Sequence, residues 1–263
     1  MKDEERIMVQ LPSEHSHLQV KQVKIEKSTS SPTLVFLHDA LGSIAQWKKF
    51  PEKLATRCRL NAIVYDRFGH GGSGPLQCTR SEEYLHREAL ETLPALLRQL
   101  GITRPILIGH SDGGTIALIY AAYHQPAAII TEAAHAFVEE VTLEGILKAV
   151  SGKAVIVRKL KQYHGTKTEA LFDAWADTWL DDNFRHWSME GLLDRINCPA
   201  LVMQGEEDEY GSEAQVARIV SGIGPNAEAF WIENCGHVPH RQAEEVVLKK
   251  MASFIEKIKW PAK

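Results

Sequence analysis

One turn near the middle of the chain constrains the fold more than any other feature of the sequence. The apolar run at residues 105–108 leads directly into the hexapeptide GHSDGG at residues 109–114, and a helical pattern follows over residues 115–124. Ser111 at the centre of so sharp a turn needs small residues two before and two after it, since larger side chains would collide with neighbouring backbone. Both positions, Gly109 and Gly113, are glycines. The pattern predicts a strand–turn–helix unit with the Ser111 hydroxyl at its tip.

Apolar runs and helical patterns alternate on both sides of this turn. The expected strands cover residues 7–11, 17–25, 33–37, 61–65, 105–108, 127–131, 199–203 and 229–232. The expected helices cover residues 45–57, 81–100, 115–124, 212–221 and 243–258, and a polar segment at residues 28–32 breaks the chain. The first two strands alternate in polarity, as in an antiparallel start, whereas the later ones are continuously apolar. We therefore expect an α/β fold with a mostly parallel, doubly wound sheet and helices on both faces.

The alternation stops between residues 137 and 194. This stretch is rich in aromatic residues and contains no run typical of a buried strand, so it predicts several helices. A helical block inside a regular α/β order is most simply an insertion. We expect three parts: residues 1–135 as the first part of the core, residues 136–194 as a helical cap, and residues 195–263 as the second part of the core.

Composition and charge exclude several classes of function. The 263 residues are 44% hydrophobic with a formal net charge of −4, and no basic stretch suggests nucleic acid. No apolar run of about 18 residues could span a membrane, and the charged N-terminus leads into no apolar signal region. Four scattered cysteines without a CxxC pair predict free thiols in a reducing cytoplasm. No histidine pair has ligand spacing, so we expect no metal and no cofactor.

The Ser111 hydroxyl at the tip of the turn is a candidate nucleophile, and the carboxylate of the neighbouring Asp112 is an alternative one. If Asp112 occupied the tip, the residue two positions before it would be His110, which is too large for the turn. The glycines at residues 109 and 113 instead fit Ser111. Asp112 is therefore expected just past the nucleophile, with its carboxylate favouring the positive end of the following helix.

The motifs together resemble those of the α/β-hydrolase-fold superfamily, in its lidded esterase and carbon–carbon-bond hydrolase type. They are FLHDA at residues 36–40, DRFGHGGS at 66–73, GHSDGG at 109–114, GEED at 205–208 and CGH at 235–237. The resemblance implies Ser111 as nucleophile, Asp208 as acid and His237 as base, in the chain order of the family. It also implies an oxyanion hole made by the backbone N–H groups of Ala40 and Asp112.

Other residues compete for or adjoin these roles. Glu206, Glu207 and Glu209 crowd Asp208 but are expected to be solvated loop charges, and His240 is expected to begin the last helix. Relatives carry glycine where this chain has Asp39, whose side chain we expect to point away and to bond local backbone. The expected substrate pocket comprises His38, His110, His135, Phe137, Trp175, Trp179, Trp187 and Val238.

These features predict a hydrolase acting on a small-molecule substrate. The favoured reaction is cleavage of a small or medium carboxylic ester or thioester through an acyl-enzyme on Ser111. Two alternatives stay open: hydrolysis of a carbon–carbon bond in a diketone-like substrate by the same three residues, and a ligand receptor of this fold with little turnover. The oligomeric state stays open as well.

Overall fold

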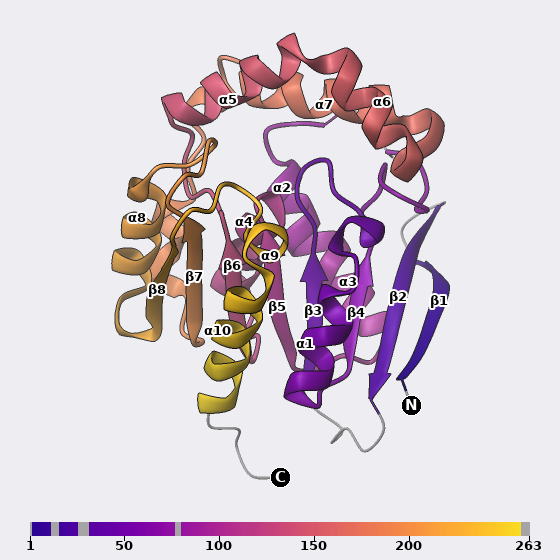
Figure 1. The fold of residues 1–263 in the computed structure, drawn as a ribbon, viewed down its shortest axis with the longest axis vertical. Coiled ribbons are helices and arrows are strands. Elements are labelled where there is room, and N and C mark those ends of the chain that lie inside the picture. The colour runs from indigo at the N-terminus through magenta and orange to yellow at the C-terminus, as the bar shows by residue number, and fades with distance from the viewer. Residues whose placement is uncertain (1, 12–15, 26–31, 77–79, 259–263) are drawn as a thin grey trace.

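A single twisted sheet forms the centre of the molecule (Figure 1). The computed structural model describes residues 2–11, 16–25, 32–76 and 80–258, so Cys78 and most of the polar segment at 28–32 lie outside the description. The sheet order is β1-β2-β4-β3-β5-β6-β7-β8. The strands are β1 (Lys2–Gln10), β2 (His17–Ile25), β3 (Thr33–Leu37), β4 (Ala62–Tyr65), β5 (Pro105–His110), β6 (Ala128–Glu132), β7 (Ala200–Gly205) and β8 (Ala227–Ile232).

Strand direction divides the sheet into two regions. β1 pairs antiparallel with β2, and β2 antiparallel with β4, whereas β4, β3, β5, β6, β7 and β8 run parallel. The expected α/β fold with a mostly parallel sheet is confirmed. β1 begins at Lys2 rather than at residue 7, because its polar first half pairs in register with β2 at the exposed edge. An edge strand needs few apolar side chains, so the pattern of apolar residues in the sequence did not reveal the polar first half of β1.

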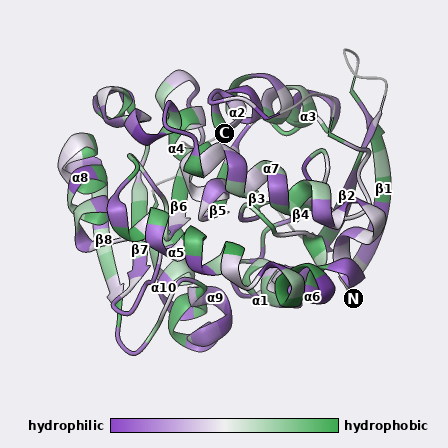
Figure 2. Cartoon of the chain, turned by 90° about the horizontal axis from the view of Figure 1, so that it is seen from above, coloured by the Kyte–Doolittle hydropathy of each residue, from purple (hydrophilic) through white to green (hydrophobic). Residues whose placement is uncertain are grey.

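Two helical layers cover the faces of the sheet (Figure 2). On one face Ile108 and Ile130 pack toward α1 and α10, and on the other Leu107 and Ile129 pack toward α3, α4 and α8. The helices of the two layers are α1 (Phe50–Cys58), α2 (Tyr84–Arg87), α3 (Leu93–Gln99), α4 (Asp112–Tyr123), α8 (Glu213–Ile223), α9 (Pro239–Gln242) and α10 (Glu244–Lys257). Alternate side chains of the parallel strands thus feed two cores, which explains why these strands are apolar throughout.

Two expected helices are interrupted. The segment 45–57 divides into a 3₁₀ turn, η1 (Ile44–Trp47), and α1, with Lys48 between them at φ 52°. The segment 81–100 begins as α2 and widens into a π turn, η2 (Glu88–Thr92), before α3. Pro94 sits at the start of α3, and because proline has no N–H to continue the hydrogen-bond ladder, the wider turn accommodates it.

Residues 136–194, which we call the helical insertion, lie above the carboxyl edge of the sheet (Figure 1). They contain α5 (Glu140–Ser151), α6 (Lys153–His164), η3 (Gly165–Lys167), α7 (Thr168–Leu180) and η4 (Phe184–His186), and η5 (Glu190–Arg195) ends one residue beyond them. A further 3₁₀ turn in the second part of the core, η6 (Gly224–Asn226), precedes β8. His164 ties the insertion to the core: its Nδ1 accepts the Gly71 N–H at 3.0 Å, and its Nε2 lies 3.0 Å from the Leu41 carbonyl oxygen. Lys167 donates to the carbonyl groups of His70 and Gly71 at 3.2 and 2.9 Å.

Cys58, Cys198 and Cys235, the cysteines among the described residues, are free thiols. None of the helices described is long and apolar enough to cross a membrane.

Candidate active site

The turn after β5 holds Ser111 in a strained conformation. Ser111 has φ 53° and ψ −119°, a region that non-glycine residues rarely adopt and that stores on the order of 1–3 kcal/mol. A Cβ atom on Gly109 would lie 2.1 Å from the Gly113 carbonyl oxygen, and one on Gly113 would lie 2.1 Å from that of Leu37. No other residue type fits either position, so the two glycines account for the sharp turn that raises Ser111 to the edge of the sheet.

Three side chains form a hydrogen-bonded line at this edge. His237 Nε2 lies 3.0 Å from Ser111 Oγ, and His237 Nδ1 lies 2.8 Å from Asp208 Oδ1. Asp208 follows β7 and His237 follows β8, so loops from neighbouring strands bring together residues far apart in sequence. The Asp208 carboxylate is 1% exposed and also accepts the Tyr210 N–H at 2.9 Å. The geometry suits proton transfer from a serine hydroxyl to an oriented imidazole.

The environment shifts the pKa values of the two titratable members. Burial alone would lower the pKa of His237, but the hydrogen bond and charge of Asp208, helped by the charges of Asp39 and Glu209, raise it above the ordinary value. Burial alone would raise the pKa of Asp208, but the contacts with His237 and the Tyr210 N–H lower it. Asp208 therefore stays ionised and stabilises the protonated form of His237.

The competing residues have other partners. Glu206 and Glu207 are exposed, as expected. Glu209 is exposed too, but its carboxylate accepts the backbone N–H of His237 at 3.2 Å. His240 does not begin the last helix, α10, but lies in the short helix α9 before it; it is buried, and its Nδ1 lies 2.6 Å from Glu132 Oε2. His240 is therefore paired with Glu132 at the end of β6.

The backbone N–H groups of Ala40 and Asp112 are those expected from the sequence to form an oxyanion hole. Asp112 is the first residue of α4, and Ala40 lies in the loop after β3. Within the described part of the chain, no backbone oxygen outside regular elements accepts from either N–H group. Both residues border the cavity that contains Ser111. Backbone N–H groups that face a developing oxyanion can stabilise an anionic tetrahedral intermediate.

The side chain of Asp39 differs from expectation. It was expected to bond local backbone, but in the described residues its carboxylate has no hydrogen-bond donor; it packs over Gly42, where a Cβ would lie 1.8 Å from Asp39 Oδ1. Asp39 is half-buried at the cavity wall, and its charge raises the pKa of His237. The local backbone is held instead by Arg67 and His38, which leaves the carboxylate to face the histidines.

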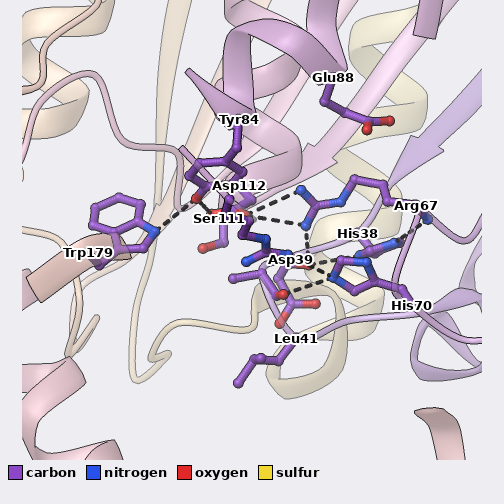
Figure 3. Close-up of polar contacts among 12 residues, drawn as sticks. His38, Asp39, Leu41, Arg67, His70, Tyr84, Glu88, Ser111, Asp112 and Trp179 are labelled. Atoms are coloured by element: carbon purple, nitrogen blue, oxygen red, sulfur yellow. Dashed lines mark hydrogen bonds and ion pairs between the residues drawn. The ribbon is translucent and has the colours of Figure 1, made fainter. Parts of the chain in front are cut away.

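The side chain of Asp112 lies in the first turn of α4, as expected, and has further partners. Instead of serving only the helix end, its buried carboxylate lies 3.3 Å from two guanidinium nitrogens of Arg67 and accepts the Tyr84 hydroxyl at 3.0 Å (Figure 3). Neither Arg67 nor Tyr84 was singled out from the sequence. The sequence signal that could have revealed this contact was Arg67 itself, in the dipeptide Asp66-Arg67 directly after an apolar strand. An arginine that is buried there needs a buried acid as its partner.

A cavity of about 260 Å³ opens above Ser111. Of the residues expected to line it, His135, Trp175, Trp179 and Val238 do so. The other walls, missed from the sequence, are Leu41, Thr142, Ile146, Glu209 and Tyr210, next to Asp39, Ala40, Asp112 and the Ser111–His237 pair. Two of these, Thr142 and Ile146, lie on the helical insertion at positions without aromatic side chains or motifs, which is why only the tryptophans attracted attention.

Four expected pocket residues lie outside this cavity. His38 accepts the Arg67 N–H at 3.0 Å, and His110 contacts the His237 carbonyl oxygen at 2.7 Å, so both brace the loops behind the site. Trp187 stacks on Phe184 with ring centroids 5.5 Å apart, and Phe137 forms an isolated bridge with Ser188. Their aromatic character serves packing rather than the cavity wall.

The residues that the structure describes include no group of three or more His, Cys, Asp or Glu side chains that could hold a metal ion. The polar side chains that line the cavity are those of Ser111, Thr142, Tyr210, His135, His237, Asp39, Asp112 and Glu209, besides the indole groups of two tryptophans.

Comparisons with known proteins agree with this architecture. Serine hydrolase BPHL of Homo sapiens is 29% identical over 175 residues, 62% of this chain and 57% of that protein, so this chain covers less than two thirds of that relative's length. The fold is similar to a membrane phospholipase A described as a bacterial virulence factor (TM-score 0.77, 22% identity, 97% of this chain and 86% of that chain). It is also similar to an enol-lactonase from Burkholderia xenovorans (TM-score 0.76, 16% identity, 95% and 100%). The alpha/beta hydrolase family model matches residues 34–249. This chain belongs to the alpha/beta hydrolase family.

Proposed function

We propose that this protein is a serine hydrolase that cleaves small or medium, uncharged carboxylic esters or thioesters through an acyl-enzyme on Ser111. The observation that carries the proposal is the line Ser111–His237–Asp208, with contacts of 3.0 and 2.8 Å, below a cavity of about 260 Å³. The human relative is itself named a serine hydrolase, which supports the same chemistry.

The first half of the reaction forms the acyl-enzyme. Ser111 Oγ attacks the substrate carbonyl carbon while its proton passes to His237 Nε2, and the carbonyl oxygen becomes an oxyanion facing the N–H groups of Ala40 and Asp112. Asp208 holds the imidazole with its Nδ1 protonated and stabilises the positive charge. The tetrahedral intermediate then collapses, the bond to the alcohol or thiol breaks, and His237 returns the proton to that leaving group.

The second half releases the acid. His237, neutral again, takes a proton from a water molecule as the water oxygen attacks the acyl carbon. The same two N–H groups face the second oxyanion. Collapse of this intermediate breaks the bond to Ser111 Oγ, which regains a proton from His237, and the carboxylic acid leaves.

The walls of the cavity favour an uncharged acyl group. No lysine or arginine is among the described residues that line it, whereas Asp39 and Glu209 contribute carboxylates. A substrate carboxylate buried there would lack a partner and would meet like charge. The volume is at the lower end for small-molecule sites. These features favour a neutral ester over an acidic diketone. In this proposal the helical insertion acts as a cap, with Trp175 and Trp179 against the acyl group.

Labelling and substrate profiling test the proposal together. A fluorophosphonate should modify Ser111, as mapped by mass spectrometry. Turnover should be highest with neutral short-chain and medium-chain esters or thioesters, lower with acyl groups that end in a carboxylate, and absent with diketones. Hydrolysis of a diketone carbon–carbon bond in preference to all esters would assign the alternative reaction. Absence of labelling and of all turnover in folded protein would favour a receptor.

A further inference from the structure

A buried arginine links the two sides of the proposed oxyanion hole. Arg67 lies just past β4 with its side chain 4% exposed. Both terminal nitrogens of its guanidinium lie 3.3 Å from Asp112 Oδ2, and Nη2 also donates to the Asp39 carbonyl oxygen at 2.7 Å (Figure 3). Asp112 supplies one oxyanion N–H, and Asp39 directly precedes Ala40, which supplies the other. One planar, rigid group therefore spans the backbone segments whose separation defines the hole.

The same aspartate connects to the helical insertion. Asp112 Oδ1 accepts the Tyr84 hydroxyl at 3.0 Å, and the Tyr84 oxygen accepts the indole N–H of Trp179 at 2.9 Å. Trp179 lies on α7 and borders the cavity above Ser111. In this series of hydrogen bonds, the indole donates to the phenol oxygen and the phenol hydroxyl donates to the carboxylate. We call Arg67, Asp112, Tyr84 and Trp179 the Arg67 network.

His38 also fixes the loop after β3 that carries Asp39 and Ala40, which we call the oxyanion loop. Its Nε2 accepts the Arg67 backbone N–H at 3.0 Å, so its Nδ1 carries the proton and donates to the Asp39 carbonyl oxygen at 2.8 Å. Burial lowers the pKa of His38 well below the ordinary value, which keeps the ring in this neutral form. The Asp39 carbonyl group thus has two side-chain donors, besides the Gly42 N–H at 3.1 Å. So many donors on one carbonyl group fix the peptide that carries the Ala40 N–H.

We propose that Arg67 and Tyr84 are positioning residues: they set the distance between the two oxyanion N–H groups and tie that setting to the contact of Trp179 with the acyl group. The inference rests on the proposed function. A substrate that holds Trp179 in this position preserves the hydrogen bond from Tyr84 to Asp112. Asp112 in turn holds the Arg67 guanidinium in hydrogen-bonding distance of the Asp39 carbonyl group. Binding energy at the helical insertion is thereby used to complete the hole, which raises kcat rather than affinity alone.

A second tyrosine in the same buried cluster provides a matched control. The Tyr65 hydroxyl donates to Glu88 Oε1 at 2.6 Å, and both groups are buried, as are Tyr84 and Asp112. Removing either hydroxyl leaves a buried carboxylate with one donor fewer. Only the Tyr84 hydroxyl lies on the path to the oxyanion loop. A purely structural role predicts equal effects of the two substitutions, whereas positioning predicts that Tyr84 alone affects catalysis.

The experiment compares Arg67→Lys, Tyr84→Phe and the control Tyr65→Phe by steady-state kinetics on a neutral ester. Arg67→Lys keeps a positive charge beside Asp112 but loses the second guanidinium nitrogen, which reaches the Asp39 carbonyl group. We therefore expect kcat to fall about 10²-fold, as for loss of one oxyanion donor, with KM nearly unchanged. Tyr84→Phe should lower kcat about tenfold, the equivalent of one hydrogen bond to a charged group. Tyr65→Phe should keep the wild-type kcat, with a melting temperature lowered as much as that of Tyr84→Phe.

A double substitution tests the link to the helical insertion. Trp179→Phe retains a ring but removes the indole N–H, and its effect on kcat should not add to that of Tyr84→Phe, because both break the same chain. If Tyr84→Phe and Arg67→Lys lower kcat no more than Tyr65→Phe does, the positioning role is wrong. Full additivity of Trp179→Phe and Tyr84→Phe would remove the link to the insertion.

Hydrogen exchange of the peptide covering residues 38–42 separates this proposal from the proposed function. Exchange should be faster in Arg67→Lys and Tyr84→Phe than in wild type, and unchanged in Tyr65→Phe. This readout does not depend on substrate. If wild-type protein cleaves no ester, the proposed function fails, and exchange at residues 38–42 still decides whether the Arg67 network fixes this loop. Equal exchange in all four proteins would overturn the network whatever the activity.

Discussion

The carboxyl edge of the sheet and the helical insertion contribute to one cavity in different ways. Ser111 and Asp208 follow closely on β5 and β7, whose residues are all buried, and His237 follows the edge strand β8. Thr142, Ile146, Trp175 and Trp179 instead come from α5 and α7, which lie across the top of that edge (Figure 1). The first group is polar and hydrogen-bonded in a line; most of the second is apolar.

Under the proposed function, this difference separates reaction chemistry from substrate choice. Proton transfer requires donor and acceptor within about 3 Å, and loops anchored in a buried sheet hold that precision. Enclosing an acyl group requires only apolar area, which helices supply without exact register. Changes at the sheet edge should therefore affect all substrates alike, whereas changes in the insertion should alter their ranking.

The largest effect is expected at the nucleophile. Ser111→Ala should lower ester turnover by about 10⁶-fold, as for a comparable serine hydrolase, and abolish fluorophosphonate labelling. Alanine fits the same backbone, because Gly109 and Gly113 create the turn, so the melting temperature should stay close to that of wild type. Turnover and labelling are measured side by side. Retained turnover in a folded Ser111→Ala protein would remove the sheet edge from the chemistry.

The acid behind the base comes next. Asp208→Asn should lower kcat by about 10⁴-fold, since an amide no longer selects the imidazole tautomer that leaves Nε2 free to accept a proton. The matched control is Glu207→Gln, the adjacent exposed acid, which should retain activity. Kinetics with several acyl lengths should show the same loss for each. A loss confined to long or short acyl chains would contradict the division between the two regions.

A smaller and selective effect is expected in the insertion. Trp175→Ala should change the ratio of kcat/KM for long over short acyl chains by about tenfold or more, because Trp175 borders the cavity. Trp187→Ala is the control, since Trp187 stacks on Phe184 outside the cavity. Truncating a well-packed tryptophan lowers the free energy of unfolding by about 3–5 kcal/mol, so melting temperatures are measured for both variants. An unchanged length profile for Trp175→Ala would exclude this wall from substrate choice.

The fold was largely predictable because its signals are local. The continuous apolar runs of β3 to β7 and the glycines around Ser111 indicated the parallel sheet and the turn without any tertiary information. Helix interiors were harder to predict. The break at Lys48 and the π turn before Pro94 depend on how each helix meets the sheet, and propensity does not record that. The polar first half of β1 depends on its pairing with β2.

The candidate site divides along the same boundary. Ser111, Asp208 and His237 could be named from motifs, because each is fixed by its place after a strand. The wall residues could not, since Ile146 and Thr142 look like any residues of an amphipathic helix. The partners of Asp112 were missed for a further reason: the contact with Arg67 joins two loops that only the folded sheet brings together.

The smallest expected effect concerns pH and tests the sheet edge again. Only neutral His237 accepts the Ser111 proton, so kcat/KM should rise with pH through the pKa of His237, which Asp208 raises above its ordinary value of about 6.5. Activity is then lost as the pH falls through that raised pKa.

The negative charge of Asp39 also stabilises the protonated ring, so Asp39→Asn should move the midpoint of the profile to lower pH. Glu228→Gln, at the start of β8 and the far edge of the sheet, should leave the midpoint unchanged. Because salt screens a half-buried charge, the difference between wild type and Asp39→Asn should shrink as ionic strength rises. A midpoint that moves to higher pH in Asp39→Asn would mean that this carboxylate does not act on His237 through its charge.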